Sequence, residues 1–149
     1  MMLPKLPFAS EQFRAITSAN PECAWDALTA TGVPLDYLHG MTAATDWQPG
    51  AAVTLALTGQ WRLTGEVLAA ERPRRLSCTL DDPPGSPVVY VTWELHPAGD
   101  GTIIRLTVDE PWPLAVSSED LESAWLPVLS GLVKHLERGP SSPSERTKK

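Results

Sequence analysis

The chain has 149 residues, of which 42% are hydrophobic, and this suits one domain with a single core that needs neither disulfides nor a structural metal. A formal net charge of -6 and a pI near 5.0 argue against nucleic acid or an anionic membrane as a partner. No apolar run is long enough for a signal peptide or for the ~20 residues of a membrane span. With Cys23 and Cys78 as its cysteines, we expect a cytoplasmic protein with reduced thiols.

The first part of the chain predicts one strand and two short helices. Residues 1–10 carry two prolines and little pattern, so we expect a loose lead-in. Residues 11–19 predict a strand, and Asn20 then caps a helix that starts at Pro21 and runs to about Ala30. A second short helix is expected over 34–39. The first helix should bury Ala24, Trp25 and Leu28.

From residue 43 the pattern changes from helical to alternating, with turn residues at short intervals. Sequential strands joined by short loops predict an antiparallel meander with one face exposed to solvent. The odd-numbered residues of the strands over 53–58 and 61–67 should face inward, and Leu76, Cys78 and Leu80 continue this inward set. The predicted strands are 43–47 at an edge of the sheet, 53–58, 61–67, 76–80, 89–95 and 104–108.

Residues 118–138 predict a long helix around which the rest of the chain is organised. Acidic residues occupy its first turn and basic residues its last, as the helix dipole favours. Pro127 lies inside the pattern and predicts a bend near Ala124, because proline removes one backbone hydrogen bond. Residues 140–149 are rich in serine, proline and charge and should be disordered. The apolar stripe of the helix consists of Leu121, Trp125, Val128, Leu129, Leu132 and Leu136.

This order of elements predicts an α+β fold in which a curved sheet wraps round the last helix. Short sequences in a fixed order carry a more specific signal: AWDALT at 24–29, DWQPG at 46–50, GEVL at 65–68, RPRRL at 72–76, VTWEL at 91–95, GT at 101–102 and WLPVLSGL at 125–132. Together they resemble the bacterial single-domain relatives of the C-terminal domain of the Hsp90 ATPase activator, within the START-related (SRPBCC) helix-grip superfamily. The resemblance covers residues 11–139, which we take as the domain.

The resemblance implies about seven strands that grip the C-terminal helix, with a cavity between them that in many relatives holds an apolar or amphipathic molecule. It implies little about chemistry, because family members bind ligands, act as cyclases or hydrolases, or contact protein partners. The sequence departs from the family pattern at 131–134, where relatives often have a Leu-Lys pair directly, and at 49–51, where a double glycine is common. Both departures concern the pocket and leave the fold unchanged.

Aromatic side chains supply the candidate cavity wall. Trp47, Trp61, Trp93 and Trp125 are expected to converge on the gap between helix and sheet, where large rings with an N–H suit a ligand. Alternatively, the rings fill this gap as core. His39 could orient a ligand or act as an acid or base, although a surface position is the simpler interpretation. The predicted cavity residues are Tyr37, His39, Met41, Trp47, Trp61, Leu63, Cys78, Trp93, Trp125 and Leu129.

The sequence leaves three functions open. No spacing of histidine, cysteine and carboxylates indicates a metal site, and no nucleophile elbow or phosphate-binding glycine loop occurs, so we expect no cofactor. The leading expectation is binding of a small hydrophobic or amphipathic molecule without catalysis. The first alternative is a cyclase- or dehydratase-type enzyme with His39 as its acid or base. The second is a co-chaperone-like interaction module, for which a homodimer or a protein partner and a place in the stress response are expected.

Overall fold

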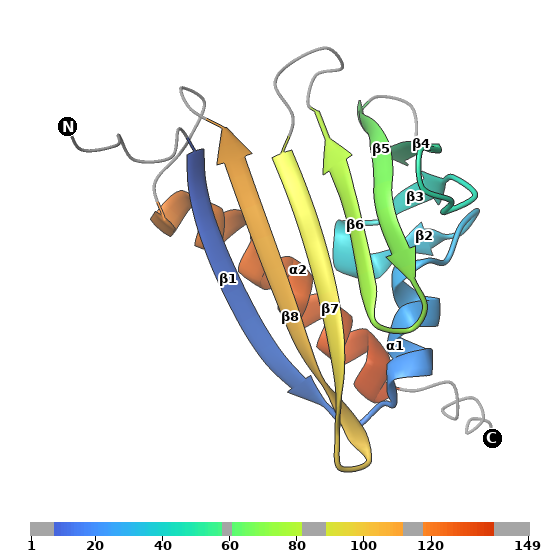
Figure 1. Ribbon diagram of the computed structural model, residues 1–149, viewed down its shortest axis with the longest axis vertical. Helices are drawn as coiled ribbons and strands as arrows, with labels where there is room; N and C mark the ends of the chain where they lie inside the picture. Colours follow the sequence, from blue (N-terminus) through green and yellow to red (C-terminus); the bar gives the residue numbers. More distant parts are fainter. Residues whose placement is uncertain (1–7, 58–60, 82–88, 112–117, 139–149) are drawn as a thin grey trace.

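The computed structural model describes residues 8–57, 61–81, 89–111 and 118–138 and shows an antiparallel sheet curled around a long helix (Figure 1). This confirms the predicted α+β helix-grip architecture, with an eight-stranded sheet where about seven strands were expected. The strands are β1 (Phe8–Thr17), β2 (Pro34–Leu35), β3 (Met41–Ala44), β4 (Ala52–Leu57), β5 (Trp61–Glu71), β6 (Arg75–Leu80), β7 (Val89–Ala98) and β8 (Gly101–Pro111). The helices are α1 (Pro21–Leu28), the single 3-10 turn η1 (Asp36–Leu38) and α2 (Ser118–Arg138).

The strand order is β1-β8-β7-β6-β5-β4-β3-β2, so β2 to β8 form the predicted meander. The first strand adds to the far edge by pairing antiparallel with the last, a partnership that no local pattern predicts. The register aligns Phe13, Leu106, Trp93 and Leu76 across four neighbouring strands. All four side chains are buried, so this row forms part of the inner face of the sheet.

The region between α1 and β4 differs from the prediction. Pro34 and Leu35 pair with Thr42 and Met41 as strand β2, and only the three residues of η1 are helical. The turn closes because the Gly40 amide donates to the Leu35 carbonyl at 2.9 Å. Consequently the predicted edge strand over 43–47 becomes β3, which has β2 on one side and β4 on the other.

The first helix follows its local signals. The Asn20 side chain accepts a hydrogen bond from the Cys23 amide at 2.8 Å, and Pro21 occupies the first helical position. The buried residues of α1 are those predicted, Ala24, Trp25 and Leu28. The helix packs against β7, β8 and the C-terminal helix.

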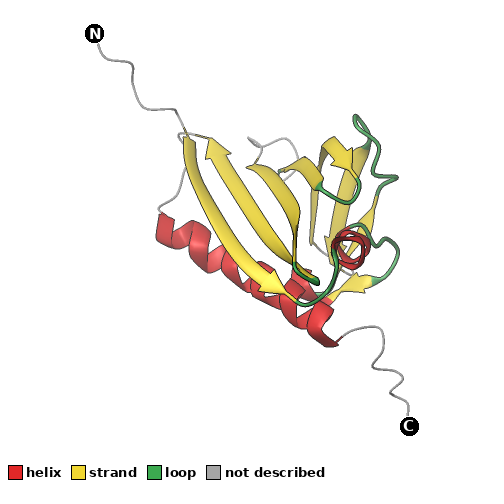
Figure 2. Cartoon of the chain, turned by 60° about the horizontal axis from the view of Figure 1, so that its bottom comes forward, coloured by secondary structure: helices red, strands yellow, loops and turns green. Residues whose placement is uncertain are grey.

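The long helix α2 has the predicted bounds and runs unbroken through Pro127. Val128, Leu129, Leu132 and Leu136 of its apolar stripe are buried, and Trp125 is half-buried. Figure 2 shows the helix lying across one face of the curled sheet. Burial of each such side chain contributes about 1.5 to 3 kcal/mol. No helix in the described ranges is long and apolar enough to cross a membrane.

The sheet curls most strongly along β5. The first half of this strand pairs with β4 up to Glu66, and the second half pairs with β6 from Val67 onward, with a register shift before Ala69. A Cβ atom on Gly65 would lie only 1.7 Å from the Thr79 carbonyl oxygen, so the close approach of the two strands requires glycine. This curl turns β3 and β4 out of the plane of β1, β8 and β7 (Figure 1).

The boundaries of the predicted domain lie partly outside the described residues. Strand β1 begins at Phe8, three residues before the strand that the sequence predicts. Residues 1–7 of the expected lead-in and the whole expected tail over 140–149 are not among the described residues. The same holds for residues 82–88 of the loop between β6 and β7.

Candidate binding cavity

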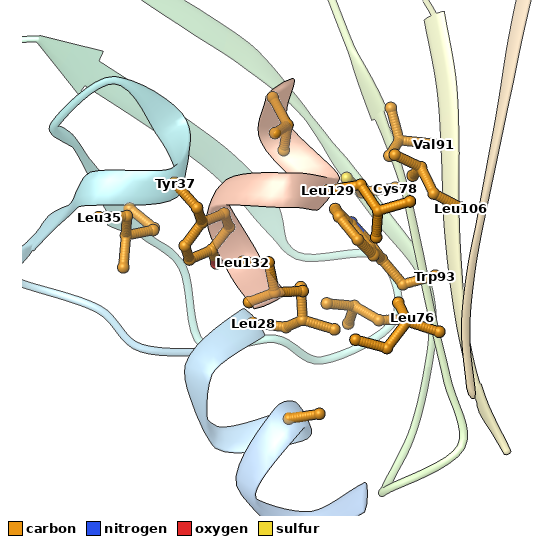
Figure 3. Close-up of a cluster of buried hydrophobic side chains, with 14 of the residues drawn as sticks. Leu28, Leu35, Tyr37, Leu76, Cys78, Val91, Trp93, Leu106, Leu129 and Leu132 are labelled. Carbon is orange, nitrogen blue, oxygen red and sulfur yellow. The ribbon is translucent and has the colours of Figure 1, made fainter. Parts of the chain in front are cut away.

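A cavity of about 600 Å³ lies between the inner face of the sheet and the first half of α2, with η1 and the end of α1 along one side. Strands β3 to β7 all contribute to its wall. Figure 3 shows part of this wall, where Tyr37 projects from η1 and Trp93 from β7 toward the helix. Most of the lining side chains are hydrophobic, which is typical of small-molecule sites.

Most of the predicted cavity residues line this space. Leu129 of α2 is not among the described lining residues. Its side chain is only 1% exposed and belongs to the hydrophobic core. The Trp61 side chain lies outside the described residues. The other three tryptophans of the prediction, Trp47, Trp93 and Trp125, line the cavity and do not fill it. The predicted residues that line the cavity are Tyr37, His39, Met41, Trp47, Leu63, Cys78, Trp93 and Trp125.

Sequence reasoning missed part of the wall. Alternation placed Val53, Leu55, Leu76, Leu80 and Val91 on the inner face, but could not tell which inward residues meet a helix and which meet a gap. Nothing in the local sequence signals the polar and irregular positions. These are Asp81, which follows a strand, and Ser123 and Pro127 on α2.

Pro127 changes the helix wall of the cavity. Because proline has no amide hydrogen, the carbonyl of Ser123 receives no helical hydrogen bond from the residue four positions later. Ser123 and Pro127 both line the cavity. The proline that predicts a bend therefore leaves a backbone acceptor without its usual helical donor at this wall.

Two aromatic side chains fasten α1 to the cavity wall. The Tyr37 hydroxyl donates to the Ala27 carbonyl at 2.9 Å, and the Trp47 indole N–H donates to the Thr29 carbonyl at 2.9 Å. Carbonyls at the end of a helix lack helical partners, so these bonds satisfy otherwise orphaned acceptors. Burial, and secondarily the Asp36 carboxylate, raises the pKa of the Tyr37 phenol above its ordinary value. The hydroxyl of Tyr37 and the indole N–H of Trp47 therefore both donate to the protein backbone and are not available to a ligand as donors.

Two wall residues have left-handed backbone conformations. His39 has φ 59° and Trp47 has φ 55°, although neither is glycine. For a bulky residue such as Trp47 this conformation is strained, and such strain clusters at ligand sites. The His39 side chain is exposed and has no hydrogen-bond or ion-pair partner among the described residues. In this part of the chain no group orients its imidazole.

Cys78 faces the cavity from β6 as a neutral thiol. Burial raises the pKa of this thiol to about 12, because the surrounding apolar wall disfavours the thiolate. The side chain therefore behaves as a small hydrophobe at neutral pH.

The η1 side of the cavity is held against α2. The Asp36 carboxylate accepts from Arg138 and lies 3.2 Å from His135 Nδ1. Gly131 permits the close contact, since a Cβ atom there would lie 3.2 Å from both the Cα and the Cβ of Tyr37. The short turn thus closes onto the helix.

Among the described lining residues, Asp81 carries the acidic side chain. Asp81 lines the cavity and accepts a hydrogen bond from the Thr64 hydroxyl. No lysine or arginine occurs among the described lining residues. In the same described ranges, no group of three histidine, cysteine or acidic side chains could hold a metal ion. The described part of the wall is thus mainly hydrophobic, with one carboxylate and few other polar groups.

Comparison with protein families shows which family the chain belongs to. The profile of the family described as Activator of Hsp90 ATPase homolog 1-like protein matches residues 18–137. The chain belongs to this family. No curated protein matches the sequence significantly.

Solved structures of similar proteins share the AHSA1-like fold of this chain. CalU16 from Micromonospora echinospora is 25% identical, with a TM-score of 0.64 over 91% of this chain and 79% of CalU16. Protein MLL2253 from Mesorhizobium loti is 24% identical, with a TM-score of 0.73 over 88% of this chain and 98% of that protein. The Aha1 dimer from Colwellia psychrerythraea is 17% identical, with a TM-score of 0.70 over 89% of this chain and 98% of Aha1. The last two likenesses, below 25% identity, concern the fold alone.

Proposed function

We propose that this AHSA1-like protein binds a small apolar or amphipathic molecule in the cavity between the sheet and α2. The observation that carries the proposal is the cavity of about 600 Å³, which stays open although three tryptophans stand in its wall. Ligand pockets of drug-sized molecules have volumes of this order, about 300 to 1,000 Å³. Apolar burial would supply most of the affinity.

The chemistry of the wall favours binding over catalysis. The Cys78 thiol is neutral, and the Tyr37 hydroxyl already donates a hydrogen bond to a backbone carbonyl. His39, the acid or base of the enzyme alternative, is exposed and lacks an orienting partner among the described residues. General acid–base catalysis needs a positioned group within hydrogen-bond reach of the substrate. The enzyme alternative therefore has less support than binding.

The proposal is tested by uptake of N-phenyl-1-naphthylamine, a neutral probe whose fluorescence rises in apolar surroundings. We expect saturable binding with one site per chain. Native mass spectrometry of freshly purified protein then tests for a retained molecule, whose mass excess over the denatured chain would help to identify it. Absence of both probe uptake and mass excess would contradict the proposal.

A matched pair of variants places the binding site. Leu63→Trp adds a ring to the cavity wall and should weaken probe binding about tenfold or more, because it removes volume available to the probe. Leu68→Trp makes the same change on the same strand at an exposed side chain, and should leave binding unchanged. Equal effects of the two variants would place the probe outside the cavity.

The family match favours a second candidate, a co-chaperone-like interaction module. One structural neighbour is an Aha1 dimer, and another, from Plasmodium falciparum, is named as an HSP90 activator. On the outer sheet face, Arg14, Arg105, Glu94 and Arg75 lie in one row across four strands, a charged strip suited to a polar protein surface. Stimulation of the ATPase of a bacterial Hsp90, lost in Arg14→Glu, would favour this candidate. Sedimentation would show whether the chain is a homodimer.

We also infer a cytoplasmic location, which the state of the cysteines supports. Cys23 and Cys78 are both free thiols, as is usual in reducing compartments. Fractionation of cells that produce the protein at native level tests this, and recovery outside the cytoplasm would contradict it.

A further inference from the structure

Trp93 places an unsatisfied hydrogen-bond donor in the cavity wall. Its side chain extends from β7 into the space beside α2 and is only 7% exposed (Figure 3). The indole N–H is a donor only, and buried indoles usually find an acceptor. Within the described residues no acceptor receives the Trp93 N–H. Since Trp93 lines the cavity, an acceptor held there could be the partner of this donor.

The other rings of the wall show the contrast. The N–H of Trp47 already donates to the Thr29 carbonyl. Trp125 is half-buried, so its side chain is partly open to solvent. Trp93 combines burial, a position in the cavity wall and a donor without a partner in the described chain, and a buried donor left unpaired is costly. A ligand atom that accepts this hydrogen bond would remove the penalty.

The surroundings restrict what kind of acceptor fits. No lysine or arginine occurs among the described lining residues, whereas the Asp81 carboxylate does. A carboxylate or phosphate on the ligand would thus lose its hydration without gaining a countercharge from the described part of the wall. A hydroxyl on the ligand would accept the bond from Trp93 but would also bring a donor of its own. The residues paired with Trp93 on the two adjacent strands are Leu76 and Leu106, whose side chains cannot accept a hydrogen bond from it. A carbonyl oxygen accepts without donating and meets neither difficulty.

We infer that the cavity of this protein takes an uncharged apolar molecule bearing a carbonyl group, whose oxygen accepts the hydrogen bond of the Trp93 indole N–H. This inference rests on the proposed binding function and adds the chemical class of the ligand. Ketones, quinones and esters with a hydrophobic body belong to this class. The body fills the apolar wall, and the carbonyl fixes its orientation at β7.

The test uses two probes that differ at one group, benzophenone with a carbonyl and diphenylmethane with a methylene. Each displaces N-phenyl-1-naphthylamine, and the ratio of their dissociation constants is compared between the wild type and Trp93→Phe. This comparison cancels the different water solubilities of the probes. Loss of the indole N–H should shift the ratio about fivefold against benzophenone, the effect of one ordinary hydrogen bond. Trp25→Phe, at a buried ring outside the cavity wall, should leave the ratio unchanged.

A second readout needs no variant that could misfold. In isotope-labelled wild-type protein, the Trp93 indole N–H resonance should move downfield with benzophenone and much less with diphenylmethane. In the displacement assay, 4-benzoylbenzoate, which adds a carboxylate, should bind about tenfold or more weakly than benzophenone. Equal binding of this anion would overturn the neutral character of the ligand.

The outcomes separate the two proposals. If both probes bind, the ratio is the same in Trp93→Phe and the indole resonance responds equally to both, the carbonyl inference is overturned and cavity binding stands. If neither probe nor the fluorescent dye binds, the proposed function itself fails, and the inference with it. A ratio that shifts in Trp93→Phe but not in Trp25→Phe supports the inference.

Discussion

The two ends of the curled sheet use the same alternation of side chains to opposite effect. On β8, Ile104, Leu106 and Val108 are all fully buried, and α2 packs closely against the neighbouring edge strand β1. On β3 to β6 the inward residues line the cavity of about 600 Å³. Hydrophobic patterning therefore marks a face as inward but does not say whether that face is filled. What stands opposite the face decides between core and cavity.

The difference follows from the geometry of one helix against a curled sheet. The buried stripe of α2 covers the end of the sheet formed by β1 and β8. The curl at β5 carries β3 and β4 away from this part of the helix. At the second end, η1, the end of α1 and the first half of α2 surround the cavity without filling it. Evenly apolar strands thus produce a dense region and a hollow one.

The largest expected effect tests the filled end. Leu132 is fully buried on α2, and Leu132→Asp would place a carboxylate without a partner in the core. We expect a loss of about 4 kcal/mol or more, enough to unfold a domain of ordinary stability. Thermal melting followed by circular dichroism measures this. Ser130→Asp, at an exposed position two residues away, should change the midpoint little, and an unchanged midpoint in Leu132→Asp would show that α2 does not carry the core.

The next effect concerns the chemistry of the hollow end. The pKa of Cys78 is raised to about 12 from 9.0, which lowers its thiolate fraction about a thousandfold at mildly alkaline pH. Iodoacetamide should therefore label the half-exposed Cys23 rapidly and Cys78 extremely slowly in the native protein. Peptide mass mapping reads out the two rates. Similar rates would mean that the cavity is wet and polar around β6.

A smaller effect compares the two ends through the same substitution. Leu106→Ala removes a fully buried side chain from the filled end and should cost about 3 kcal/mol, because it leaves a void in close packing. Leu63→Ala, at a half-buried side chain in the cavity wall, should cost about 1 kcal/mol, since part of its surface already lacks neighbours. Urea unfolding measures both. Equal losses would mean that the cavity wall is packed as tightly as the core.

The smallest effect concerns the joint between β1 and the end of α2. The Glu137 carboxylate accepts hydrogen bonds from the Thr17 hydroxyl and from the amide and hydroxyl of Ser18, the last two at 2.8 and 2.7 Å. These bonds hold the pKa of Glu137 below its ordinary value of 4.5, and the bond from Thr17 contributes most. Because the folded pKa is lowered, the stabilisation is present at neutral pH and is lost as the pH falls through the carboxyl range.

Glu137→Gln should therefore lower the melting temperature slightly at neutral pH, and the difference from wild type should shrink as the pH falls below about 4. Glu122→Gln on the same helix, at an exposed residue, provides the control. A difference that stays constant across this range would show that the carboxylate charge plays no part in the joint.

The local elements could be predicted from the sequence because their causes are local. Asn20 and Pro21 start α1 as expected, and the stripe of leucines predicts α2 with its observed bounds. Of the short helix predicted over 34–39, only η1 is helical, since pairing of Pro34 and Leu35 with β3 overrode the helical pattern. Pairing with the strand that follows the turn, and not the local helical pattern, decided that segment.

The candidate site could be predicted only in part. Aromatic and inward residues such as Trp47 and Cys78 do line the cavity, whereas Leu129 belongs to the core and Asp81 was not foreseen. Periodicity gives the face of each residue but not the distance to the element opposite. The donor of Trp93 could not be recognised at all, because an unsatisfied N–H is a statement about every neighbour in space.

By itself the sequence determined the elements, their order, their inward faces and the resemblance to the helix-grip family. These follow from hydrophobic period, capping and turn residues, which act within a few positions along the chain. Only the tertiary structure decided the partnership of β1 with β8, the curl along β5 and the residues left facing open space. Those depend on how a long helix meets a twisted sheet, a geometry set by packing between residues far apart in the chain.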